Sequence, residues 1–161
     1  MLASSIDEYV KMLQFLDKAF SFSKGYSLTI RPHPLIDFRK ALRLYDPKGL
    51  QYEIDKGILN ESLKASDLVL YASSSVSLEA ISMGIPVICI GLRDVLDTDP
   101  LFNMSLLKWT CKEPQELETL IKTISDIEKD CFIDIQKRAL QFSRLYCVPI
   151  SSESMESFVR H

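Results

Sequence analysis

Glycine is scarce in this chain, and no glycines stand in the spacing of a phosphate-binding loop. The 161 residues contain five glycines. They form neither a G-x-G-x-x-G fingerprint nor a Walker A sequence. Nicotinamide-dependent dehydrogenases and P-loop NTPases hold phosphate with such loops. The sequence therefore disfavours both classes, and any phosphate site must be built differently.

The chain also lacks paired cysteines. None of its four cysteines forms a C-x-x-C pair, and three stand among apolar residues. This pattern predicts reduced, mostly buried thiols of a cytoplasmic protein rather than a disulfide framework or a zinc site. The acidic residues Asp94, Asp97 and Asp99 are interpreted as solvated loop carboxylates, so we predict neither a metal site nor a cofactor.

Long apolar runs and an excess of basic charge are missing as well. No apolar run approaches the ~20 residues needed to span a bilayer, and the charged segment that follows Ser5 does not suit a signal peptide. Lys and Arg number 19 against 22 Asp and Glu, a formal net charge of −3. We therefore expect a cytoplasmic protein with no general affinity for nucleic acid.

The chain is rich in alternating helical and extended segments. The strand expected at 26–30 alternates apolar and polar residues, whereas those expected at 67–71 and 86–90 are almost continuously apolar, as in a sheet covered on both faces. Helices are expected between the strands. The pattern predicts an α/β fold, a Rossmann-like three-layer domain with a parallel sheet. The whole chain is predicted to form one domain. Met1, Leu2 and Ala3 are interpreted as the tail of a first strand. Ser5 and Glu8 have the spacing of a capping box at the start of the first helix, and Gly84 is expected to end the helix 74–83. The elements expected are helices 6–23, 37–45, 58–65, 74–83 and 114–127, further helices at 132–146 and 152–159, strands 26–30, 50–54, 67–71 and 86–90, and a loop 91–100.

The first candidate site is the segment Arg31-Pro32-His33-Pro34, which follows a predicted strand. Ligands of open α/β sheets collect beyond the carboxyl ends of the strands. The prolines fix the backbone around His33, and an imidazole beside Arg31 is suited to reading a phosphate. The alternative is a stiff turn with an exposed histidine.

The second candidate site is Ser73-Ser74-Ser75, which leads from a buried strand into a helix. A helix N-terminus offers free N–H groups and partial positive charge to a phosphate. Capping alone needs only one serine. In that helix Ser75, Glu79 and Ser82 form a polar stripe on one face. Arg93, in the loop after the next strand, is a further phosphate candidate.

The stretch SDLVLYASSSVSLEAISMGIPVI, residues 66–88, resembles the C-terminal, nucleotide-sugar-binding domain of GT-B glycosyltransferases. In that superfamily an "aDl.i..SS...EA...G.PVi" run lines the donor site. The RPHP tetrapeptide looks like that of bacterial capsular and surface-polysaccharide transferases. It is also similar to the glycerophosphotransferases of teichoic acid synthesis and, more distantly, to UDP-GlcNAc 2-epimerases. Helix 114–124 resembles the family's "-PeeL...I" element.

The resemblance implies a donor site for a UDP-, CDP- or CMP-activated sugar. His33 would contact the donor phosphate, Ser73 to Ser75 would hold phosphate, and Glu79 would bond the ribose hydroxyls. Such enzymes usually take their catalytic base from an N-terminal acceptor domain, which has no counterpart here, so no catalytic residue is assigned. The chain is expected to be a fragment or subunit that needs that domain as partner and is inactive alone. Peripheral membrane association of the full enzyme fits this class.

A second class of function stays open at this point. The chain could be a nucleotide- or partner-binding α/β domain without chemistry, or a relative of the glycerophosphotransferases or the epimerases. The single internal histidine, His33, argues against the epimerases, which keep further catalytic histidines. The sequence identifies neither the sugar nor the acceptor.

Overall fold

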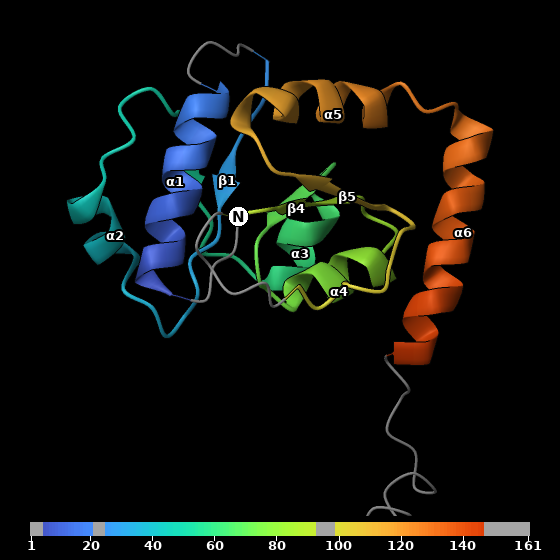
Figure 1. The fold of residues 1–161 in the computed structure, drawn as a ribbon. Helices are drawn as coiled ribbons and strands as arrows, with labels where there is room; N and C mark the ends of the chain where they lie inside the picture. The colour runs from blue at the N-terminus through green and yellow to red at the C-terminus, as the bar shows by residue number, and fades with distance from the viewer. Residues whose placement is uncertain (1–4, 21–24, 93–98, 147–161) are drawn as a thin grey trace, which may run out of the picture.

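The computed structural model describes residues 5–20, 25–92 and 99–146 as an α/β fold (Figure 1). Short strands alternate with helices, as the sequence predicts. The elements are α1 (Ile6–Phe20), β1 (Thr29–Ile30), α2 (Phe38–Leu44), β2 (Glu53–Ile54), α3 (Leu59–Lys64), β3 (Val69–Tyr71), α4 (Val76–Ser82), β4 (Val87–Ile90), β5 (Lys108–Cys111), a 3-10 turn (Pro114–Glu116), α5 (Leu117–Ser125) and α6 (Lys129–Tyr146).

The strands form two separate parallel sheets. In one sheet β1 pairs with β2, and in the other the strand order is β3-β4-β5. Val69 pairs with Val87, which in turn pairs with Lys108. The prediction of an α/β fold with parallel strands is confirmed, whereas the strands expected in one sheet are divided between two. The strand β5 was not predicted, because it lies in a stretch to which the sequence analysis assigned no element.

β3 and β4 of the larger sheet are buried on both faces, which explains why these two strands are almost continuously apolar. Alternate residues of β3 and β4 enter two different hydrophobic clusters. Leu70, Ile88 and Ile90 join the cluster that includes α1, α2 and α5. The residues between them pack into the cluster that includes α3, α4 and α6: Val69, Tyr71, Val87 and Cys89. Helices therefore supply apolar side chains to both faces of this sheet.

Helix α1 begins with half of the predicted capping box. The backbone N–H of Glu8 donates to Ser5 Oγ at 3.1 Å, the contact expected of an N-terminal serine. Its apolar stripe includes Tyr9, Met12 and Leu16, all fully buried. The helix is described to Phe20, and the rest of the predicted span 6–23 lies outside the described residues.

Gly84 ends α4, as the sequence predicts. Its φ of 75° is left-handed, and two backbone bonds close the turn, from Gly84 N–H to Ile81 O and from Ile85 N–H to Ala80 O, both 2.9 Å. This is the Schellman arrangement, which favours glycine. Gln136 of α6 donates to the Gly84 carbonyl at 2.7 Å, which fixes α6 against the end of α4.

Several predictions fall on other parts of the chain. Arg93, the segment Met1 to Ala3 and the helix expected at 152–159 lie outside the described residues. The helix expected from Phe132 begins earlier, at Lys129.

Candidate functional site

The first turn of α1 brings the two predicted motif segments together. The Ser73 hydroxyl donates to Glu8 Oε1 at 2.7 Å across 65 residues of sequence. The next residue of the helix, Tyr9, accepts a hydrogen bond from the His33 backbone N–H through its hydroxyl. Consecutive residues of α1 therefore hold the segment after β3 and the segment after β1. The carboxyl ends of these two strands therefore meet at one helix turn, and ligands of α/β sheets collect beyond such strand ends.

His33 is fixed by several bonds. Its carbonyl accepts the Ile36 N–H at 3.1 Å, so Pro34 occupies the second position of a β-turn, where proline is favoured. Its ring Nδ1 accepts the Leu35 N–H at 3.2 Å. A neutral imidazole whose Nδ1 is an acceptor carries its proton on Nε2. His33 is half-buried, and it can present Nε2–H as a donor to an anion.

The serines of the second motif have different roles. Ser73 is bonded to Glu8, while the Ser74 carbonyl accepts the Ser77 N–H at 3.2 Å and the Ser77 hydroxyl at 2.8 Å. Ser75 is exposed and makes no side-chain cap for α4. Ser77 is fully buried and acts in the turn itself. Of the three predicted serines, Ser75 has the hydroxyl that is most accessible to a ligand.

The predicted polar stripe of α4 lies at the surface. Ser75, Glu79 and Ser82 are exposed, whereas Ala80 and Ile81 of the same helix are fully buried. The Ser82 hydroxyl donates to the Glu79 backbone carbonyl at 2.7 Å, not to its carboxylate. The Glu79 carboxylate has no capping role in α4, and its assignment to ribose stays a prediction.

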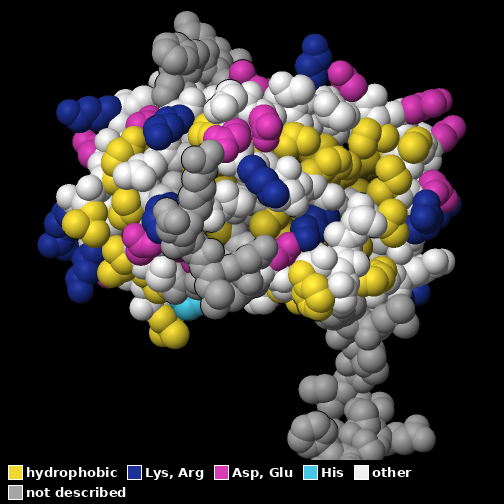
Figure 2. Space-filling view, viewed as in Figure 1, with side chains coloured by type: hydrophobic (Ala, Val, Ile, Leu, Met, Phe, Trp, Pro, Cys, Tyr) yellow, Lys and Arg dark blue, Asp and Glu magenta, His cyan; other side chains and the backbone are white. Residues whose placement is uncertain are grey.

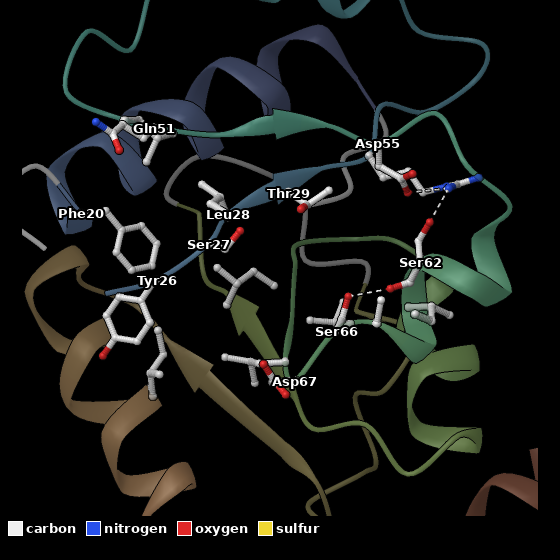
Figure 3. Close-up of a pocket in the computed structure, with 18 of the residues that line it drawn as sticks. Phe20, Tyr26, Ser27, Leu28, Thr29, Gln51, Asp55, Ser62, Ser66 and Asp67 are labelled. Carbon is white, nitrogen blue, oxygen red and sulfur yellow. Dashed lines mark hydrogen bonds and ion pairs between the residues drawn. The ribbon is translucent and has the colours of Figure 1, made fainter. Parts of the chain in front are cut away.

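Arg31 forms an ion pair inside the chain. One guanidinium nitrogen lies 2.6 Å from Asp55 Oδ2 and 3.0 Å from the Gly57 carbonyl (Figure 3). The same nitrogen lies 3.4 Å from the hydroxyl of Ser62. Arg31 therefore ties the end of β1 to the turn between β2 and α3. The structure shows this role for Arg31, and contact with phosphate stays a prediction.

The carboxyl group of Asp55 is shaped by the same contacts. Burial raises its pKa, but hydrogen bonds from Ser62 and the Gly57 N–H, together with Arg31, outweigh burial and hold its pKa below the usual value. Because the pKa of this carboxyl group is lower in the folded state than in the unfolded state, its ionised form stabilises the protein at pH values above the unfolded pKa of about 4. That contribution is lost as the pH falls through the folded pKa.

We expect Asp55→Asn to lower the free energy of unfolding at pH 7 by about 1 kcal/mol, the range of a partly exposed ion pair. The difference from the wild type should shrink toward zero as the pH falls through the folded pKa of Asp55, because the wild-type carboxyl is then protonated. Urea unfolding of both proteins at several pH values measures this difference in the free energy of unfolding. Glu53→Gln, at an exposed glutamate of neighbouring β2, is the matched control. A difference that does not change with pH would refute the ionic role.

A groove of about 1290 Å³ separates the two sheets (Figure 3). Leu28 and Thr29 lie on one side and Asp67 on the other (Figure 3). A smaller apolar cavity of about 280 Å³ adjoins it, where Ile121 of α5 lines both, and hydrophobic side chains gather beneath α5 in Figure 2. Of the predicted donor residues that the structure describes, only Arg31 lines the groove. The motif segments lie instead around the first turn of α1.

A buried ionic cluster anchors the chain next to the serine motif. Lys108 at the start of β5 pairs with Asp99, and both side chains are less than a tenth exposed. The interpretation of Asp99 as a solvated loop carboxylate is therefore wrong, because this carboxylate is buried and paired. Tyr71, the last residue of β3, donates to Asp99 at 2.7 Å. Burial and this hydrogen bond raise the pKa of Tyr71, so it stays protonated. The cluster fixes the end of β3 from which the serine segment departs.

Glu8 and Tyr9 are the site residues that the sequence analysis missed. Glu8 was explained by its capping-box spacing and Tyr9 was not singled out. The one feature of the sequence that points to Glu8 is its place as a charged residue beside the apolar positions of a core-facing helix. Glu8 is 1% exposed, which is rare for a glutamate unless it is hydrogen-bonded.

No model of a known protein family matches the sequence, and no curated protein matches it. No helix among the described residues is long and apolar enough to cross a membrane. Within the same residues, no group of three or more histidine, cysteine or acidic side chains is placed to hold a metal ion.

Proposed function

We propose that this chain is the donor-nucleotide-binding half of a GT-B-type glycosyltransferase of surface or capsular polysaccharide synthesis. One observation carries the proposal: consecutive residues of α1, Glu8 and Tyr9, hold the Ser73 and His33 segments at the carboxyl ends of β3 and β1. These are the two segments that resemble the family's donor site, and they converge where α/β sheets bind ligands.

The proposal includes a three-layer, Rossmann-like arrangement. Parallel strands support it, as do the two hydrophobic clusters that receive alternate residues of β3 and β4. Helices on both faces leave the carboxyl edge of the sheet as the open side. A nucleotide seated there would lie across the loops that follow β1 and β3.

Each motif residue has a role in this proposal. His33 donates Nε2–H to a phosphate oxygen, since its Nδ1 is occupied as an acceptor. Ser75 adds a hydroxyl at the start of α4. Glu79, about 6 Å further along α4 at ~1.5 Å per residue, accepts the ribose hydroxyls. Ser73, bonded to Glu8, positions the turn.

We expect a nucleotide to stabilise the isolated chain while no sugar transfer occurs. A ligand with a dissociation constant of about 100 μM, added at about 1 mM, should raise the melting temperature by roughly 4 °C. A thermal-shift screen of UDP, CDP, CMP and GDP measures the binding. Nucleotide sugars incubated with the purified chain measure turnover, which needs donor and acceptor oriented together.

Two results would contradict the proposal separately. Robust sugar transfer by the chain alone would contradict the half-enzyme assignment. A melting temperature that none of the four nucleotides changes would contradict the donor site and favour an α/β domain that binds another partner.

A further inference from the structure

The outward face of α2 carries basic and apolar side chains and no acidic one. Phe38 and Ala41 of this helix are buried, and the Phe38 ring packs edge-on against that of Tyr9 in α1 at 5.1 Å. At 3.6 residues per turn the opposite face consists of four residues, all exposed: Arg39, Lys40, Arg43 and Leu44. Lys and Arg side chains gather at the left of Figure 2, where Figure 1 places α2.

The three cations of this face are not neutralised by neighbouring carboxylates. Among the residues that the structure describes, Arg39, Lys40 and Arg43 take part in no ion pair. The Asp37 carboxylate, next to them in sequence, accepts the Arg39 backbone N–H at 3.0 Å and caps the helix. The chain as a whole has a formal net charge of −3, so α2 is a local basic surface on an acidic chain.

Two exposed leucines flank these cations in the sequence. Leu35, in the turn that leads into α2, is 88% exposed, and Leu44, at the end of the helix, is 71% exposed. The Leu35 backbone N–H donates to His33 Nδ1 at 3.2 Å, so the turn that presents this side chain is already ordered. A leucine gains free energy when it leaves water for an apolar phase. A membrane offers such a phase beside its anionic groups, whereas the phosphate backbone of a nucleic acid does not.

We propose that the outward face of α2, together with Leu35, docks on an anionic phospholipid surface. Arg39, Lys40 and Arg43 bind the anionic headgroups, and the two leucines enter the boundary between the headgroups and the acyl chains. Binding of this kind combines buried apolar area with attraction between basic side chains and anionic lipid. The inference concerns a surface of this chain alone and does not rest on the proposed nucleotide site.

The charges set the size of the expected effect. Each basic side chain near an anionic membrane raises the partition coefficient by about fivefold, so the three cations together favour an anionic over a neutral membrane by about 100-fold. Salt screens this attraction, because the Debye length falls from ~10 Å at 0.1 M to ~3 Å at 1 M. Binding that depends on α2 should therefore weaken steeply as the salt concentration rises.

Co-sedimentation of the full chain with lipid vesicles measures the partition coefficient. We expect the wild type to bind vesicles of phosphatidylcholine and phosphatidylserine in equal amounts about 100-fold more strongly than vesicles of phosphatidylcholine alone. A triple variant of the basic face should lose about tenfold or more of this binding: Arg39→Gln, Lys40→Gln, Arg43→Gln. The matched control changes the net charge equally at exposed lysines of α5 and α6 and should lose less than about threefold: Lys122→Gln, Lys129→Gln, Lys137→Gln.

A second variant tests the leucines. Leu35→Ser, Leu44→Ser leaves the charge unchanged and should lower binding to the anionic vesicles by about fivefold or more. All of these substitutions replace exposed side chains, so the melting temperatures should stay within about 2 °C of the wild type.

Three results would overturn the proposal. One is equal binding of the wild type to the anionic and the neutral vesicles. Another is an equal loss of binding in the triple variant of α2 and in its control. The third is binding of heparin, but of neither kind of vesicle, through Arg39, Lys40 and Arg43, which would favour a polyanion in solution over a membrane.

Discussion

Lys108→Met should lower the free energy of unfolding by about 3–5 kcal/mol, because it leaves the buried Asp99 carboxylate without its cationic partner. Lys108 also donates to the Leu101 carbonyl at 2.7 Å, which would lose that donor. For a chain of this size the loss corresponds to a fall in melting temperature of roughly 10 °C. Urea unfolding and calorimetry measure it.

Lys122→Met is the matched control, because Lys122 is an exposed lysine of α5 and its replacement should change stability by less than about 0.5 kcal/mol. The double variant Lys108→Met, Asp99→Asn should lose less than the sum of the single losses, since no unpaired charge then stays buried. Additive losses, or a loss below about 1 kcal/mol for Lys108→Met, would show that the pair is effectively solvated.

Glu79→Gln should weaken nucleotide binding about 10- to 100-fold while leaving the melting temperature of the unliganded chain unchanged. A carboxylate that accepts ribose hydroxyls contributes charge-assisted bonds of about 1.5–3 kcal/mol, and every ~1.4 kcal/mol is tenfold in affinity. The fold should tolerate the change because Glu79 is exposed and caps nothing. Calorimetric titration with the best nucleotide of the screen measures the affinity.

Glu61→Gln is the control for Glu79, since Glu61 is an exposed glutamate near the start of another short helix, α3. It should leave nucleotide affinity unchanged. Equal affinities for Glu79→Gln and wild type would refute the ribose role. A large fall in the melting temperature of unliganded Glu79→Gln would make Glu79 a structural residue instead.

Local patterns in the sequence predicted most elements but not the long-range role of one residue. The Ser5–Glu8 spacing predicted a helix start, and the Ser5 Oγ contact is present. That local explanation accounted for Glu8 fully, yet its carboxylate bonds Ser73 across the fold. No spacing rule reports a contact between residues 65 positions apart, so the link between the two motifs could be found only in three dimensions.

The strand β5 shows a different limit of sequence reasoning. Its residues Lys108 to Cys111 mix partly buried, exposed and buried side chains, although it pairs with the wholly buried strand β4. β5 therefore lacks the continuous apolar run that identified β3 and β4. Lysine side chains are mostly exposed, so the residue type of Lys108 suggests a surface position. Its side chain is instead 9% exposed and ion-paired.

Backbone amide NMR of the chain, titrated with UDP, CDP, CMP and GDP, shows whether a nucleotide binds where the segments after β1 and β3 meet at α1. We expect saturable shifts at His33, Ser75, Val76 and Glu79 with at least one of these nucleotides. Saturable shifts confined to Leu28, Thr29 and Leu68 in the groove would contradict this binding site. The absence of any saturable shift up to about 5 mM nucleotide would also contradict it, because binding would then be weaker than ~3 kcal/mol.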